Sequence, residues 1–338
     1  MKRIFISLLT VIACSMAAMA QDSRVATLQH GTNFRTYYGA DAFVSAHNDA
    51  SNGDVITLSA GEFNAGAISK AVTVRGEGMD VTVLIQVGLT CTIPNDESYS
   101  LCLEGLTLKN RTGYQSPHIR FLSDGGSATV IMSKCSITGH SSNNVDFEKC
   151  NSVILNSKLQ ANYVSSNNSS VIVKNSIFTS ANEGASCTLR GTSFDIQNCF
   201  IVNSNLKEMV NSSIKNSIVG VSDGVEYSID ETVTSSHCLV REGGSGFDNS
   251  WYVTGTAPTP DPWGETPVVT LWDDLFTEEP YHLTEEAAQT YVGTDGTEVG
   301  IYGGDYPYNE IPDYPLVKSI DVKGIHENGK LSVDIKVE

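Results

Sequence analysis

Two carboxylates and two cations have the types and spacing that chemistry on a substrate would need. Asp146 and Glu148 belong to a short segment with alternating apolar residues, so both face outward from one strand. Hydrolysis by acid catalysis uses two carboxylates that face each other across one bond. Arg120 and Arg190 occupy outward positions in similar segments and would anchor an anionic substrate. The alternative is structural: Arg120 and Asp146 form an exposed ion pair between adjacent strands, worth at most about 1 kcal/mol.

Four aromatic residues after position 250 form a candidate set for substrate binding. They lie among loop signals, where large aromatic rings can stack on sugar rings. Two interpretations remain open, because the same rings could instead pack the last turn of the fold. These residues are Trp251, Tyr252, Trp263 and Trp272.

The cysteines do not indicate a metal site. Apart from Cys14, they show no CxxC pair and no histidine at zinc-like spacing, so we expect no metal and no other cofactor. Most of them lie inside alternating apolar segments, where a thiol behaves as a small buried hydrophobe. We therefore predict buried thiols and not a disulfide framework for Cys91, Cys102, Cys135, Cys150, Cys187, Cys199 and Cys238.

Charge excludes one class of partner. The 338 residues include 21 Lys+Arg and 39 Asp+Glu, for a net charge of −18. Binding to nucleic acid needs clustered cations, so nucleic acid is not an expected partner. The charges nearly balance over residues 21–220, and the acidic excess lies in residues 221–338. An acidic region of this kind commonly keeps an exported protein soluble, and a cation-binding surface is the alternative.

The N-terminus predicts export. Lys2 and Arg3 precede the apolar run Ile4–Ala13, and Ala18–Ala20 is a small-x-small cleavage site. The protein is then periplasmic, at the cell surface or extracellular. In an alternative interpretation Val11–Cys14 is a lipobox, which would anchor the protein through a lipid on Cys14. No stretch reaches the roughly 20 apolar residues of a transmembrane helix, so no membrane span is expected.

An internal repeat must position these residues. Segments rich in Val, Ile, Ser and Asn recur every 18 to 23 residues, which is a solenoid period, and their alternation is that of strands. Each unit has a short first strand, a turn and an aligned second strand, and we expect equivalent strands to stack in parallel from about Val55 to Leu239. The aligned segments are 130–137, 153–159, 171–177, 194–200 and 213–218, preceded by first strands at 118–121, 145–147, 163–164, 188–189 and 209–210.

One turn position of the repeat carries asparagine. Asn175, Asn198 and Asn216 recur there, and we align Ser157 and Cys135 with them in the earlier units. Asparagine tolerates the left-handed backbone conformation, and stacked amides can hydrogen-bond to one another. The pattern predicts an asparagine ladder.

The two ends of the repeat have their own signals. Residues 41–49 predict a short amphipathic helix that covers the open N-terminal end. Two alternating segments, 317–322 and 331–337, flank Asn328-Gly329 and predict a β-hairpin. This hairpin would cover the C-terminal end or serve as an attachment module.

The opening segments 41–49, 53–63, 68–78 and 82–85, followed by the coil repeats, resemble the right-handed parallel β-helix of the pectate-lyase-like superfamily. Residues 281–284 and 292–304 resemble the closing segment of exported bacterial β-helix proteins. The resemblance implies an all-β fold with a signal peptide (1–20), an N-terminal cap (21–50), β-helix coils (51–240), an acidic loop-rich closing segment (241–304) and a C-terminal hairpin tail (305–338).

The resemblance does not fix an activity, because that superfamily includes lyases, hydrolases, esterases and non-catalytic proteins. Val145-Asp146-Phe147 is similar to the motif around the nucleophilic aspartate of pectin methylesterases, but that family's Gln-Asp-Thr and Gly-Arg-Pro-Trp motifs are missing. The motifs of polygalacturonases are also missing, and residues 21–220 lack the acidic trio with which pectate lyases hold Ca²⁺. We therefore expect a binding or structural module for a polysaccharide or cell-surface glycan, with a polysaccharide esterase, lyase or hydrolase as the alternative.

Overall fold

The computed structural model describes most of the chain that follows the N-terminal segment. The described residues are 23–86, 88–95, 98–111, 118–126, 128–139, 143–181, 187–202, 204–220, 227–241, 244–253, 271–314, 317–325 and 331–337. The export signal and Cys14 lie outside them.

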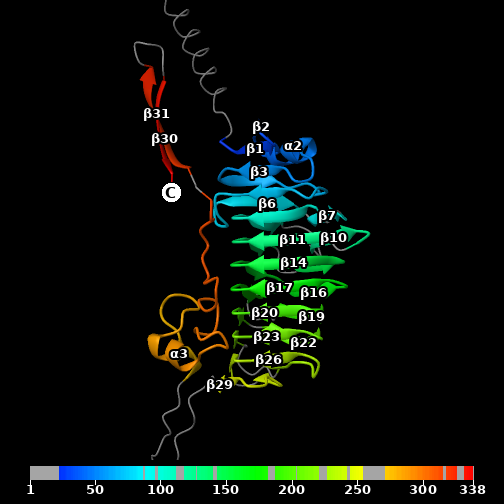
Figure 1. Ribbon diagram of the computed structural model, residues 1–338, viewed down its shortest axis with the longest axis vertical. Helices are drawn as coiled ribbons and strands as arrows, with labels where there is room; N and C mark the ends of the chain where they lie inside the picture. The colour runs from blue at the N-terminus through cyan, green and yellow to red at the C-terminus, as the bar shows by residue number, and fades with distance from the viewer. Residues whose placement is uncertain are drawn as a thin grey trace, which may run out of the picture.

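The chain forms a parallel β-solenoid (Figure 1). Each complete turn contributes one strand to each of three sheets, and equivalent strands of successive turns stack on one another. This confirms the predicted all-β parallel β-helix. The 11-stranded sheet contains β1 (Val25–His30), β2 (Asn33–Tyr38), β3 (Val55–Leu58), β5 (Thr73–Arg75), β8 (Ser100–Glu104), β11 (Ala128–Ser133), β14 (Cys150–Leu155), β17 (Ser170–Lys174), β20 (Phe194–Gln197), β23 (Ser213–Lys215) and β26 (Thr234–Ser236).

The other two sheets complete each turn. The 10-stranded sheet contains β4 (Gly61–Asn64), β6 (Thr82–Gln86), β9 (Thr107–Asn110), β12 (Ser136–Thr138), β15 (Lys158–Gln160), β18 (Ile177–Thr179), β21 (Phe200–Val202), β24 (Ile218–Gly220), β27 (Leu239–Arg241) and β29 (Trp251–Val253). The six-stranded sheet contains β7 (Thr90–Pro94), β10 (His118–Asp124), β13 (Asn144–Glu148), β16 (Tyr163–Asn167), β19 (Cys187–Thr192) and β22 (Ser204–Val210). Two short strands, β25 (Tyr227–Ser228) and β28 (Gly244–Ser245), form a separate parallel pair.

Alternation along each strand creates the central core. In β11 every second residue is buried, and the same pattern recurs in the strands stacked on it. Inward residues from successive turns lie directly above one another, as the rings of Phe121 and Phe147 show with centroids 5.2 Å apart and nearly parallel planes. Each turn therefore buries its apolar face against its neighbours and not within itself.

The thiols belong to this stacking. All seven cysteines of the described chain are free, and all except the half-buried Cys102 are buried, as predicted. Cys135, Cys199 and Cys238 share one column beside a turn with serines, and the backbone N–H of each cysteine donates to the serine hydroxyl of the next turn at 3.1–3.2 Å. Burial raises the pKa of the Cys135 and Cys199 thiols to about 12, so they stay protonated and unreactive at neutral pH.

The predicted asparagine ladder exists as a column of left-handed turns, but its members and bonds differ from the prediction. Lys134, Asn156, Asn175, Asn198, Asn216 and His237 occupy it with φ of 46–54°. Cys135 and Ser157 each lie one residue later, so aligning them with the asparagines was wrong. We call this column the turn ladder. The backbone N–H of a member donates to the carbonyl of the residue before the next member, for example from Asn198 to Lys215 (3.1 Å). The side-chain amides do not bond to one another along the column.

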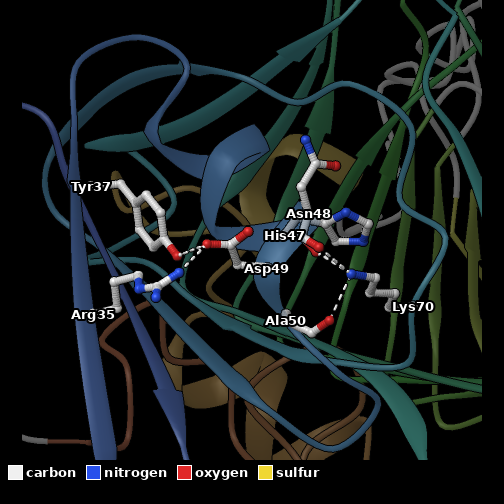
Figure 2. A network of polar contacts seen from close by, with 7 residues as sticks. All are labelled: Arg35, Tyr37, His47, Asn48, Asp49, Ala50 and Lys70. Atoms are coloured by element: carbon white, nitrogen blue, oxygen red, sulfur yellow. Dashed lines mark hydrogen bonds and ion pairs between the residues drawn. The ribbon is translucent and has the colours of Figure 1, made fainter.

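Helix α2 (Ala42–Asp49) lies at the N-terminal end of the solenoid, where a helix was predicted. It buries Ala42, Phe43, Ala46 and His47 against the first strands. Figure 2 shows how its C-terminal end is held: the Lys70 ammonium donates to the carbonyls of His47, Asn48 and Ala50 at 2.6–2.8 Å, and Arg35 and Tyr37 of β2 both bind the Asp49 carboxylate. A cation at the C-terminal end of a helix interacts favourably with the helix dipole and binds the last carbonyls.

A second hydrophobic core lies outside the solenoid. Outward side chains of the 10-stranded sheet, among them Phe200 and Ile218, are covered by residues 271–304, which include the 3-10 helix η1 (Trp272–Leu275) and helix α3 (Glu285–Thr290). We call residues 271–304 the outer module. The predicted closing segment therefore packs along the side of the solenoid, as Figure 1 shows for α3.

From the outer module the chain runs back along the turn ladder toward the N-terminal end (Figure 1). We call residues 291–314, which overlap the end of the outer module, the strap. Successive ladder side chains hold it: Asn216 binds Thr294 and Asp295, Asn175 donates to the carbonyls of Ile301 and Gly303 at 2.8 and 2.7 Å, and Asn156 accepts from the Asn309 N–H. Lys134 binds the Ile311 carbonyl and Asp313, and the Tyr314 hydroxyl reaches Gly76.

The predicted hairpin forms from β30 (Val317–Ile325) and β31 (Leu331–Val337), which pair antiparallel. It does not cover the C-terminal end of the solenoid. Because Tyr314 contacts Gly76, and three residues span only about 10 Å, Val317 must lie near the first turns. No helix in the described part of the chain has the length and apolar character that crossing a bilayer requires.

Candidate functional site

The solenoid brings the four predicted catalytic candidates onto one surface. Arg120 of β10, Asp146 and Glu148 of β13, and Arg190 of β19 all project from the outer face of the six-stranded sheet, because each alternates with buried inward residues. The strand register aligns Arg120, Asp146, Ser165, Arg190 and Glu208 in one row across five strands. We call this surface the polar face.

Asp146 is not the exposed carboxylate that a binding module was expected to have. Its side chain is only 8% exposed, and its Oδ2 lies 2.7 Å from Nδ1 of His118, one strand away. The prediction failed because His118, which is two residues before Arg120 and on the same face, covers the carboxylate. A carboxylate oriented by an imidazole is an arrangement that acid–base catalysis uses.

Arg120 also has a different partner from the predicted one. It is the register neighbour of Asp146, but its Nε lies 3.8 Å from the Glu148 carboxylate. Both side chains are more than one-third exposed, so this long contact contributes little to stability. Glu148 and Arg120 therefore remain accessible to a ligand.

Arg190 lies over an aromatic ring. Its Nε donates to the Ser165 hydroxyl at 2.8 Å, and its guanidinium carbon lies 4.4 Å from the centre of the Tyr163 ring. Tyr163 is 37% exposed. Stacking on the ring and the bond to Ser165 fix the guanidinium in one orientation, which lowers the entropy cost of binding an anion.

Sequence reasoning missed His118, Tyr163, Ser165 and Glu208 as members of the polar face. The sequence contains a signal for His118, Tyr163 and Ser165. They belong to the first strands of the repeat units, or border them, and outward positions in a strand recur every second residue. His118 and Arg120 differ by two residues, as do Tyr163 and Ser165. The register within β19 and β22, which includes a shift, was not readable from the sequence.

The aromatic binding candidates lie away from this face. Trp272 is buried in the second core, and the ring of Trp251 contacts Tyr291 edge-on at 5.6 Å. Both rings thus contact other residues of the chain on the outside of the solenoid. Tyr252 is 48% exposed, and Trp263 lies outside the described residues.

A tyrosine-lined cavity of about 380 Å³ lies between the 10-stranded sheet and the outer module. Three of its polar residues bind one another: the Tyr308 hydroxyl donates to Glu310 at 3.0 Å, and the Lys158 ammonium lies 2.7 Å from the same carboxylate. This network holds the strap on the sheet. Within the described residues, no cluster of three or more His, Cys, Asp or Glu side chains is arranged to hold a metal ion.

Comparisons of the chain with family models, with curated proteins and with solved structures gave no match.

Proposed function

We propose that this protein is an exported β-helix protein that binds a polysaccharide or cell-surface glycan along the polar face. The resemblance to right-handed pectate-lyase-like β-helices and the N-terminal export signal support this proposal. A sugar unit in a linear polymer is about as long as the strand spacing of about 4.8 Å, so successive sugars could meet successive strands.

The observation that carries the proposal is the arrangement of Arg190 on Tyr163. The arginine presents N–H donors that have no partner among the described residues, and the exposed part of the tyrosine ring offers an apolar surface beside them. Donors next to an aromatic ring suit a sugar that carries hydroxyl or carboxylate groups. Arg120 adds a second cation two strands before Ser165. We therefore expect a preference for acidic glycans.

A glycan array with the purified mature chain tests this function. We expect retention of acidic polysaccharides, a loss of about tenfold or more in affinity in Arg190→Gln, and weaker binding as salt is raised. Lys109→Gln is the matched control, since Lys109 is an exposed cation of the 10-stranded sheet whose nearest carboxylate, Glu62, is 3.9 Å away. If the wild type retains no glycan, or if Arg190→Gln binds as well as the wild type, the proposal is wrong.

A second candidate is a polysaccharide-acting esterase, hydrolase or lyase, and the His118–Asp146 contact specifically favours it. Asp146 would act as nucleophile or base, oriented by His118, while Glu148 on the same face supplies the second acid. Release of methanol, acetate or shorter oligosaccharides from a polysaccharide, abolished in Asp146→Ala with the fold intact, would establish this activity. Binding without turnover would leave the first proposal standing alone.

A further inference from the structure

A cavity of about 250 Å³ separates the turn ladder from the strap, on a different side of the solenoid from the polar face. Asn198 of the ladder, Lys174 and Lys215 belong to its solenoid wall, and Asp295 and Asp305 belong to its strap wall. Its lining is mainly polar, which distinguishes it from the tyrosine-lined cavity.

Asn198 is the anomalous member of the ladder. It is only 5% exposed, and its Nδ2 group has no hydrogen-bond partner among the described residues. The equivalent amides on both sides are used, since Asn175 donates to two strap carbonyls and Asn216 donates to Asp295. A buried N–H donor without an acceptor costs free energy, so an acceptor from outside the chain would be favourable at this point.

Two lysines flank this donor. The register aligns Lys174, Gln197 and Lys215 on successive strands, so the two lysines lie on either side of Gln197, the residue before Asn198. Neither ammonium has a carboxylate within 4.0 Å in the described part of the chain. Two carboxylates belong to the strap wall: Asp295, which accepts bonds from Thr297 and Asn216, and Asp305. The buried group that still lacks a partner is a donor, and it belongs to the solenoid wall, where the two lysines lie. An anion held on that wall faces the cations, whereas the carboxylates belong to the opposite wall.

We propose that this cavity binds a small oxyanion, a carboxylate, sulfate or phosphate group, whose oxygens accept from the Asn198 amide and the two lysines. The ligand would connect the solenoid to the strap at Asn198, the ladder asparagine whose side chain makes no hydrogen bond to the strap. This site is independent of the proposed glycan binding, because it shares no residue with the polar face.

Calorimetric titration of the mature chain with sodium sulfate, phosphate and glucuronate tests the site and separates the three sources. We expect saturable one-to-one binding of at least one of them, weakened about tenfold or more in Asn198→Gly and in the double variant Lys174→Gln/Lys215→Gln. Glycine keeps the left-handed conformation at position 198 (φ 50°), so this change removes the amide without backbone strain. The two lysines are on the solenoid surface, so the double variant should fold even where the first does not.

Matched controls are Asn168→Gly, which alters an exposed left-handed asparagine (φ 49°) of another turn, and Lys109→Gln. Both should bind as the wild type does. The Asn198 side-chain amide signal in a ¹⁵N–¹H spectrum, identified by its absence in Asn198→Gly, should shift during the titration. The proposal is overturned if no anion binds stoichiometrically, if both variants bind like the wild type, or if the amide signal does not move, which would mean that water alone occupies the cavity.

Discussion

His47 is a buried titratable group on which folding depends at acidic pH. Its Nε2 accepts a hydrogen bond from the Ser69 N–H at 3.2 Å, which requires an unprotonated nitrogen. Burial, with a smaller contribution from the Lys70 charge, lowers the pKa of His47 from 6.5 to about 4. In the unfolded chain the imidazole recovers its ordinary pKa, so the unfolded state binds more protons between these two values.

Stability should therefore fall as pH decreases from about 6.5 to about 4, by at most about 3 kcal/mol from this residue. The measurement is urea unfolding at several pH values for the wild type and for His47→Gln, which cannot titrate. The difference between the two proteins isolates His47 from the carboxylates. A difference that does not change with pH would contradict the assignment.

Asp146 shows what sequence reasoning can and cannot give at the scale of one residue. Its strand, its face and its position beside Arg120 were all predicted from the alternation and the repeat. Its burial was not, because burial depends on where the side chain of His118 turns after the strands have stacked. Such contacts are set by rotamers and not by periodicity.

We expect Asp146→Ala to destabilise the protein by about 1–3 kcal/mol, because it removes a hydrogen bond between charged or polar groups at a nearly inaccessible carboxylate. Asp124→Ala, at an exposed position of β10, should change stability by less than about 0.5 kcal/mol. Thermal or chemical unfolding of both variants checks the comparison. Equal effects would mean that the contact with His118 contributes nothing.

At the scale of elements, the turn ladder combines two roles in the same asparagine. The left-handed backbone makes the turn between the 11-stranded and 10-stranded sheets, and the amide then holds the strap. The sequence indicated the first role through the recurrence of asparagine. It did not reveal the second, because the strap partners of these asparagines are 78 to 153 residues away in the chain and have no matching period.

Substitutions at Asn175 separate these roles. Asn175→Gly keeps the turn and loses two bonds to the strap, so it should cost about 1–3 kcal/mol, whereas Asn175→Ala should cost about 1 kcal/mol more because of left-handed strain. Asn168 is exposed, so we expect Asn168→Gly to leave the free energy of unfolding nearly unchanged. Asn168→Ala should lower it only by the cost of the left-handed backbone conformation. Chemical unfolding of the four variants gives the comparison. If Asn175→Gly is as neutral as Asn168→Gly, the strap bonds contribute nothing to stability.

At the scale of the whole molecule, the parallel solenoid could be predicted because a repeat shows itself as a period in the sequence. The outer module could not, because its residues do not repeat and its apolar positions do not say which surface they cover. The sequence placed it as a closing segment, and the structure puts it on the side. The outer module packs there because it covers a row of outward apolar residues, such as Phe200, Ile218 and Leu239. Without it, these side chains would be exposed to solvent.

Because the two cores are separate, a substitution should be able to destabilise the second core without destabilising the central core. Ile301 is buried in the second core, and Ile301→Asp places a charge there without touching the central core. We expect faster hydrogen exchange throughout residues 271–304 and unchanged protection in β11, β14 and β17, since solenoid turns are stabilised by their nearest neighbours. Loss of protection in those strands would show that the solenoid depends on the outer module.

The reversed course of the strap also has a mechanical consequence. The C-terminal hairpin follows a segment whose contacts are spread one after another along the solenoid, from Gly76 to Asn216. A pulling force on the hairpin would load these contacts singly, first at Tyr314 and Lys134 and then at each later turn, as in peeling. The stacked strands, which share a load over many parallel hydrogen bonds, would remain intact while the strap yields. Under force, the strap would therefore extend while the solenoid keeps its structure.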